Sequence, residues 1–96
     1  MPLVFEWDSR KAKSNHRKHG VSFDEACTVF DDAGATIFPD EDHSNGEERE
    51  IIVGLSIFDR VLLVSFTERS TDRVRIISAR KATRREQKDY EENIGN

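Results

Sequence analysis

The sequence contains Arg75-Ile76-Ile77-Ser78-Ala79-Arg80-Lys81-Ala82-Thr83, a stretch that runs from apolar residues into cations without a break. Residues 73–80 read as a β-strand. Alternation would put Val74, Ile76, Ser78 and Arg80 on one face and Arg75, Ile77, Ala79 and Lys81 on the other. The apolar members are explained as sheet core. Arg80, with Arg75 and Lys81 beside it, is left without a structural need.

Two more strand patterns precede this stretch, at residues 49–57 and 60–68. The links between the three strands are short and polar, which favours an antiparallel meander. Shorter strands are expected at residues 4–7 and 36–38. After the last strand, Thr83 and Glu86 have the spacing of a capping box, and so predict a C-terminal helix that runs to about residue 93.

The N-terminal half predicts two helices. Asp8 can cap a helix over residues 9–18 that ends at Gly20, and Ser22 with Glu25 has capping-box spacing for a second helix. The second helix has an apolar stripe: Phe23, Ala26, Cys27 and Phe30. The order predicts one α+β domain over residues 1–96, with an antiparallel sheet of three to four strands, two N-terminal helices and one C-terminal helix.

A chain of 96 residues can bury roughly 60–70% of its unfolded surface, so it can fold without disulfides or metals. Cys27 has no partner cysteine, and its apolar neighbours suggest a small buried residue rather than a nucleophile. A reducing cytoplasm is the simplest compartment. The apolar runs are only strand-sized, so neither a signal peptide nor a membrane span is expected.

The net charge of −4 would argue against a nucleic-acid partner, but the charges are segregated along the chain. Residues 1–23 have five cations and two anions, and residues 51–85 have eight cations and three anions. Residues 24–50, in contrast, have one cation and ten anions. A basic surface is therefore possible if the two positive segments meet in space.

Arg80 can present its planar guanidinium to a phosphate at the edge of the sheet, although it could equally solvate a strand end. Glu68 and Arg69 are adjacent at the end of the preceding strand. They could line one site only if the strand ends, twists or bulges there, and the alternative is an incidental exposed ion pair.

Three histidines are candidate proton carriers. His19 precedes the helix-ending Gly20 and can act as an acid or base near neutral pH, although a histidine is also common at a helix end. His16 fits the purely structural explanation better. His43, next to Asp40 and Asp42, could bind a cation loosely, but no Cys/His set has the spacing of a zinc site, and no cofactor motif is present.

These residues suit metal-independent RNA cleavage, in which a 2′-hydroxyl attacks the adjacent phosphate. Such a reaction needs a base, an acid and a group that stabilises negative charge. Glu68 or a histidine could be the base, and His19 or His43 the acid. Arg69 and Arg80 could together hold the phosphate.

The same residues carry a family resemblance that covers nearly the whole chain. It rests on residues 5–8, 11–12, Asn15, 18–23, 25–26, Phe30, His43, 48–49, Gly54, 67–69, 75–83, Glu86 and Tyr90. In this order and spacing the chain resembles the BrnT family, the small ribonuclease toxins of bacterial type II toxin–antitoxin pairs.

The resemblance implies a RelE-like fold, RNA as substrate, arrest of translation, and neutralisation by a BrnA-type antitoxin, with DNA contacted only through that antitoxin. It marks Lys18, His19, Glu68, Arg69 and Arg80 as positions to suspect, and Arg49, Arg75 and Lys81 become candidate RNA contacts. The alternative is a non-enzymatic binding module, or an inactive family member, that acts only in complex formation and operon repression. An enzyme predicts that Arg69, Arg80 and a base converge in one cleft.

Overall fold

The structure is a computed structural model that describes residues 2–43 and 48–94. Its elements are, in chain order, β1 (Val4–Glu6), α1 (Ser9–His19), α2 (Phe23–Thr28), η1 (Val29–Asp31), β2 (Thr36–Pro39), η2 (Glu41–His43), β3 (Glu50–Leu55), β4 (Val61–Ser70), β5 (Arg73–Lys81) and α3 (Arg84–Ile94). The chain is thus an α+β protein, as the sequence predicted, and the predicted helices and strands lie within a few residues of these bounds.

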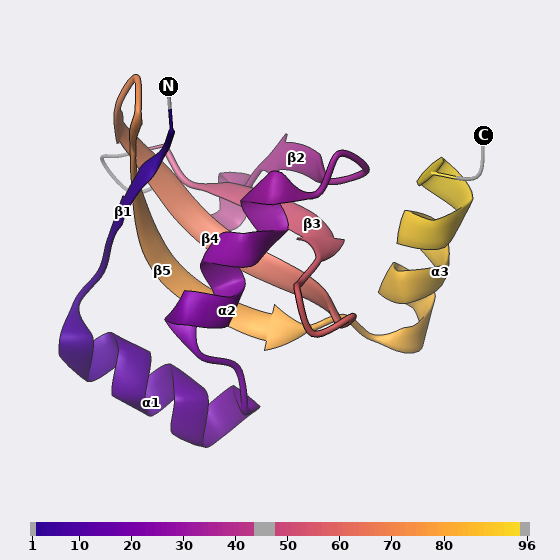
Figure 1. The fold of residues 1–96 in the computed structure, drawn as a ribbon, viewed down its shortest axis with the longest axis horizontal. Coiled ribbons are helices and arrows are strands. Elements are labelled where there is room, and N and C mark those ends of the chain that lie inside the picture. Colours follow the sequence, from indigo (N-terminus) through magenta and orange to yellow (C-terminus); the bar gives the residue numbers. More distant parts are fainter. Residues whose placement is uncertain (1, 44–47, 95–96) are drawn as a thin grey trace.

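The sheet of the described residues has five strands in the order β1-β5-β4-β3-β2 (Figure 1). Strands β2 to β5 are antiparallel to their neighbours, whereas β1 pairs with β5 in parallel, with Val4 opposite Arg73. The prediction of a three- to four-stranded antiparallel sheet is therefore wrong. A parallel pair formed by segments so far apart in sequence has no turn between its strands, and so leaves no local signal.

Helices α1 and α2 cover one face of this sheet (Figure 1). Their apolar side chains meet those of the sheet in a single core, which contains Val21, Phe23, Ala26, Val29, Ile52, Leu62, Val64, Phe66, Val74, Ile76 and Ala79. The ring of Phe30 lies 5.0 Å from that of Phe66 and 5.1 Å from that of Phe5, which ties η1 to β4 and β1.

A bulge in β5 changes which residues face the core. Ser78 lies opposite Ser65, but the next residue of β4, Phe66, lies opposite Ile76, so Ile77 is an extra residue on β5. Val74, Ile76 and Ala79 all lie in the core as a result. The predicted strict alternation is wrong here, because one inserted residue reverses the two faces beyond it. Ser78 and Arg80 therefore lie on the sheet face opposite to Val74 and Ile76.

Two glycines have identifiable structural roles, and that of Gly20 was predicted. Gly20 ends α1 with φ at 69°, a left-handed conformation that a side chain disfavours. In β3, a Cβ on Gly54 would lie 3.0 Å from the Cβ of Ala35 and 3.3 Å from the carbonyl oxygen of Val29. The close approach of residues 29–35 to β3 therefore favours a glycine at this position.

Helix α3 lies apart from α1 and α2, at the right of Figure 1, where the chain continues beyond the end of β5. The side chain of Tyr90 is buried, and its hydroxyl donates a hydrogen bond of 2.6 Å to Oδ2 of Asp32. The helix begins at the predicted capping box: the N–H of Thr83 donates to Glu86 Oε1, and the N–H of Glu86 donates to Thr83 Oγ1. No helix in the described ranges is long and apolar enough to cross a membrane.

Candidate functional site

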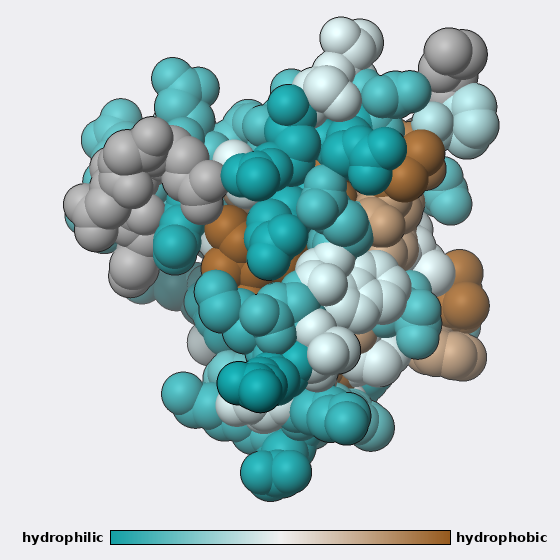
Figure 2. All heavy atoms as spheres, turned by 90° about the vertical axis from the view of Figure 1, so that its left-hand side faces the viewer, coloured by the Kyte–Doolittle hydropathy of each residue, from teal (hydrophilic) through white to brown (hydrophobic). Residues whose placement is uncertain are grey.

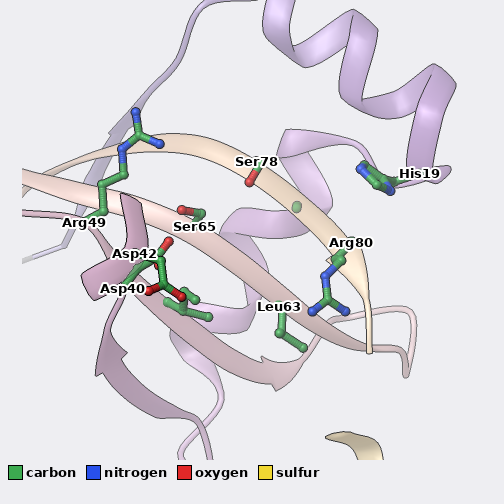
Figure 3. A pocket seen from close by; sticks show the side chains of 10 residues that line it. His19, Asp40, Asp42, Arg49, Leu63, Ser65, Ser78 and Arg80 are labelled. Carbon is green, nitrogen blue, oxygen red and sulfur yellow. The ribbon is translucent and has the colours of Figure 1, made fainter. Parts of the chain in front are cut away.

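The sheet face that α1 and α2 leave uncovered, called the open face below, carries a shallow hollow of about 390 Å³. The Arg80 hollow, as we call it, is lined by His19, Asp40, Asp42, Arg49, Ile51, Leu63, Ser65, Ser78, Ala79 and Arg80. In Figure 3, Arg49 and Arg80 lie on opposite sides of it, with the hydroxyls of Ser65 and Ser78 between them. The hollow thus combines two guanidinium groups, two hydroxyls, one imidazole and the two carboxylates of Asp40 and Asp42.

The floor of the Arg80 hollow follows from strand register. Ile51 of β3 lies opposite Ser65 of β4, which in turn lies opposite Ser78 of β5, so that these three form one row across the sheet. Leu63 and Arg80 are paired in the next row. Because the bulge at Ile77 brings Ser78 and Arg80 to this face, the hollow would not exist with regular alternation in β5.

Arg80 is held by a carboxylate. Its Nη1 and Nη2 donate to the two carboxylate oxygens of Glu86 at 2.8 and 3.0 Å, and Nη1 also donates to the carbonyl of Lys81. The Arg80 guanidinium lowers the pKa of Glu86 to about 2, helped by the hydrogen bonds from Thr83. Arg80 therefore has a structural partner, contrary to the sequence interpretation, which had placed Glu86 only in the capping box.

His19 reaches the same hollow from the other side, at the last turn of α1. A buried amide fixes that turn: Asn15 Nδ2 donates to the carbonyls of Ala79 and Val21 at 2.8 and 3.0 Å, and Asn15 Oδ1 accepts from the N–H of Ala79 at 3.1 Å. Asn15 was not singled out as functional from the sequence. The signal was present, since Asn15 lies three residues after Ala12 and four before His19, on the side of α1 that faces the sheet.

The turn that follows His19 is held by an ion pair between a buried carboxylate, Glu25, and the partly exposed Arg60. Glu25 is almost fully buried and accepts hydrogen bonds from Ser56 Oγ at 2.8 Å and from Arg60 Nε at 2.9 Å. Arg60 Nη2 bonds the second oxygen of Glu25 and donates to the carbonyl of Gly20 at 3.1 Å. The bonds from Arg60 hold the pKa of Glu25 below its usual range, against the effect of burial.

The predicted capping box of α2 is only half formed for this reason. The N–H of Glu25 donates to Ser22 Oγ at 3.0 Å, as expected. The carboxylate of Glu25, however, is bonded to Arg60 and Ser56 rather than to the backbone at Ser22. A partner 35 residues away in sequence is not visible from the local pattern.

Glu68 and Arg69 lie elsewhere, in a second hollow lined by Glu48, Glu50, Thr67, Glu68 and Arg69, called the Glu68 hollow below. A register shift between Glu68 and Ser70 lets the adjacent residues Glu68 and Arg69 line one hollow, which regular alternation of side chains would prevent. Arg69 is six residues along β4 from Leu63, the partner of Arg80, which corresponds to roughly 20 Å of strand. The predicted convergence of Arg69 and Arg80 in one cleft is therefore not observed.

The charges of the Glu68 hollow are mainly negative. Burial, together with the nearby carboxylates of Glu68 and Glu48, raises the pKa of Glu50. An anionic phosphate would meet repulsion from these carboxylates. The Arg80 hollow has two arginines, Arg49 and Arg80, to offset its two aspartates, and is the better candidate for a phosphate site.

The other predicted site residues are more scattered. Lys18 and Lys81 are exposed, Arg75 donates to Glu6 Oε2 at 3.3 Å, and Arg49 lines the Arg80 hollow. The side chain of His43 lies outside the described part of the structure. In the described ranges, no group of three or more His, Cys, Asp or Glu residues could hold a metal ion.

Cys27 is only half-buried rather than fully buried. Burial, followed by the charge of Asp24, raises the pKa of its thiol to about 12, so the thiol stays protonated at neutral pH. This agrees with the interpretation of Cys27 as a packing residue and not a nucleophile.

A protein of known structure has a similar fold. The fold is similar to that in the 1.1 Å crystal structure of the Brucella abortus ribonuclease toxin BrnT, with a TM-score of 0.64 and 23% sequence identity, over 88% of this chain and 99% of that one. At this identity the similarity shows the fold alone. A search of curated proteins gave no match.

The family follows from the sequence model. Residues 7–86 match the model described as "Ribonuclease toxin, BrnT, of type II toxin-antitoxin system". The chain therefore belongs to the BrnT family of ribonuclease toxins, as its motifs had indicated.

Proposed function

We propose that this chain is a metal-independent endoribonuclease that cleaves RNA in the Arg80 hollow. The observation that carries the proposal is that Arg80 and His19, from different elements, line the same hollow beside Ser65 and Ser78. In one hollow, the Arg80 cation can stabilise the developing negative charge and the His19 imidazole can carry out one of the two proton transfers that attack by a 2′-hydroxyl needs.

In this proposal Arg80 binds the scissile phosphate. Glu86 occupies the end of the guanidinium formed by Nη1 and Nη2, so the side formed by Nε–H and the neighbouring Nη hydrogen can donate to two phosphate oxygens. Glu86 is in turn fixed by Thr83. The cation is thus oriented before RNA binds, which favours stabilisation of the developing negative charge.

His19 moves the proton in this proposal. The 2′-oxygen forms a bond to phosphorus while the bond to the 5′-oxygen breaks, leaving a 2′,3′-cyclic phosphate and a 5′-hydroxyl. One group accepts the proton from the 2′-hydroxyl and one supplies a proton to the 5′-oxygen. We assign one of these steps to His19, and we assign Glu68 and Arg69 to contacts with RNA outside the reacting phosphate.

The test is cleavage of a labelled single-stranded RNA by purified variants in the presence of EDTA. Arg80→Gln is expected to lower the rate by about 10²–10³-fold, and His19→Gln by about 10²-fold or more. Arg84→Gln, which removes an exposed cation of α3, is the matched control and should cleave like the wild type. Undiminished cleavage by both folded hollow variants would exclude this site.

A protein partner is the second part of the proposal. Between α3 and the open face runs an apolar groove lined by Phe38, Val53, Leu63 and Tyr90 among others. We propose that a BrnA-type antitoxin binds this chain, neutralises it and mediates any contact with operator DNA. If the wild type binds the antitoxin but cleaves no RNA under any condition, the alternative function, a binding module without activity, replaces the nuclease.

The finer classification also belongs to the proposal. A strand, two helices, four strands and a helix within one chain support a RelE-like fold formed as a single toxin domain over residues 1–96. Arrest of translation and a cytoplasmic location are the corresponding expectations for its action in the cell.

A further inference from the structure

The outer surface of α1 has an unusual charge distribution. Between the capping residue Asp8 and Gly20 every acidic or basic side chain is basic, and the first acidic residue after Asp8 is Asp24. Five of these side chains are fully cationic and all five are exposed: Arg10, Lys11, Lys13, Arg17 and Lys18. Figure 2 shows that the lower part of this side of the molecule, where α1 lies, is hydrophilic.

The cationic side chains lie on the faces of α1 that point away from the sheet. At 100° per residue, Ala12, Asn15 and His19 point toward the sheet, which agrees with their partial or full burial. Arg10, Lys13 and Arg17 occupy the opposite side, and Lys11 and Lys18 flank them. Arg10 and Arg17 are about 10 Å apart along the axis. The result is a continuous cationic stripe, called the α1 stripe below, that is defined by Arg10, Lys13 and Arg17.

Helix stability does not explain this arrangement. Arg10 and Lys11 lie in the first turn, where the helix dipole disfavours positive charge, and that turn contains no acidic residue. Lys13 and Arg17 are four residues apart and repel each other. In the described part of the chain, none of the three stripe residues forms an ion pair with a carboxylate, although the charge of Arg10 attracts the nearby carboxylate of Asp8. The side chains therefore offer their charge to something outside the chain.

We propose that the α1 stripe binds the phosphate backbone of single-stranded RNA and guides it into the Arg80 hollow. This inference rests on the proposed nuclease function. RNA is favoured over other polyanions because Lys18 lies between Arg17 and His19 around the helix. The cations thus lead from the stripe to His19, which lines the same hollow as Arg80. A repeating backbone charge matches cations that are spaced along one helix face.

The test is fluorescence anisotropy with a labelled, 2′-O-methylated 20-nucleotide RNA that cannot be cleaved, titrated with the full chain. Replacing Arg10, Lys13 and Arg17 with Gln should weaken binding by about tenfold or more near 50 mM salt, and should reduce the slope of log K against log[salt] by about 2. The matched control replaces Arg84, Arg85 and Lys88 of α3 with Gln, which removes the same charge from another exposed helix.

Equal loss of affinity in the two triple variants would overturn the proposal, because it would show that only net charge matters. Equally tight binding to poly-L-glutamate or to phosphatidylserine vesicles would also overturn it, in favour of an acidic protein or a membrane surface. So would self-association at low salt that only the stripe variant abolishes. Because the RNA in this test cannot be cleaved, binding is measured separately from activity. If the wild type binds RNA through the stripe but never cleaves unmodified RNA, the proposed nuclease function is refuted, whereas RNA binding by the stripe is supported.

Discussion

Helix α1 lines the Arg80 hollow through His19, and helix α3 contacts Arg80 through Glu86, but the two helices are fastened to the sheet by different chemistry. Helix α1 is held by the neutral amide of Asn15, which is bonded to the backbone of Ala79 and Val21. Helix α3 is held by charged groups: the pair between Arg80 and Glu86, and the bond from Tyr90 to Asp32. The anchor of α1 therefore contains no group that titrates, whereas the anchor of α3 depends on ionised carboxylates.

The largest effect is expected when the amide of Asn15 is removed. Asn15→Leu leaves the buried N–H and C=O of Ala79 without their partner, and should lower the free energy of unfolding by about 3 kcal/mol. Urea unfolding at neutral pH measures this. The exposed neighbour Ser14→Ala serves as control, and an Asn15→Leu variant as stable as that control would show that the amide does not anchor α1.

A smaller effect is expected at the anchor of α3. Tyr90→Phe removes the hydroxyl that donates to the charged carboxylate of Asp32, and should cost about 1.5 kcal/mol. Burial raises the pKa of Tyr90 to about 12, and the Asp32 charge adds to the effect, so the hydroxyl remains a donor throughout the neutral range. In the Tyr90→Phe variant, amide hydrogen exchange should accelerate more in α3 than in α1, relative to the wild type. Uniform acceleration across both helices would contradict separate anchoring.

The smallest effect depends on pH. The folded-state pKa of Glu86 is about 2, below the ordinary value of 4.5, so the ionised carboxylate contributes stability that is fully present above pH 4.5 and is lost as the pH falls toward 2. Because Arg80 and Glu86 are partly exposed, we expect Glu86→Gln to cost only about 1 kcal/mol at pH 7. Unfolding of both proteins between pH 7 and pH 2 should show this difference shrink. A difference that grows toward low pH would mean that the pair destabilises the fold.

The sequence predicted well whatever depends on neighbouring residues. Asp8, Gly20 and the box of Thr83 and Glu86 mark helix ends through short-range hydrogen bonds and local conformation, and all were found where expected. The strands that are joined by short polar links were found in the predicted order as well. Such features depend on a few adjacent side chains.

The parts that were missed depend on partners far apart in sequence. Asn15 bonds a residue 64 positions away, and Glu25 one that is 35 positions away. The single extra residue at Ile77 decides on which face Arg80 lies, yet nothing in the apolar run marks it as a bulge. The predicted common site of Arg69 and Arg80 was wrong because the distance between them depends on strand register, which adjacent residues do not reveal.

The central claim is that the Arg80 hollow, and not the Glu68 hollow, is the nuclease site. Growth arrest on expression in a bacterial host tests it most directly, with Arg80→Gln compared with Arg69→Gln at equal levels of folded protein, since each variant removes one guanidinium. We predict that Arg80→Gln abolishes arrest and that Arg69→Gln largely preserves it. Full arrest by Arg80→Gln, together with loss of arrest in Arg69→Gln, would contradict the account.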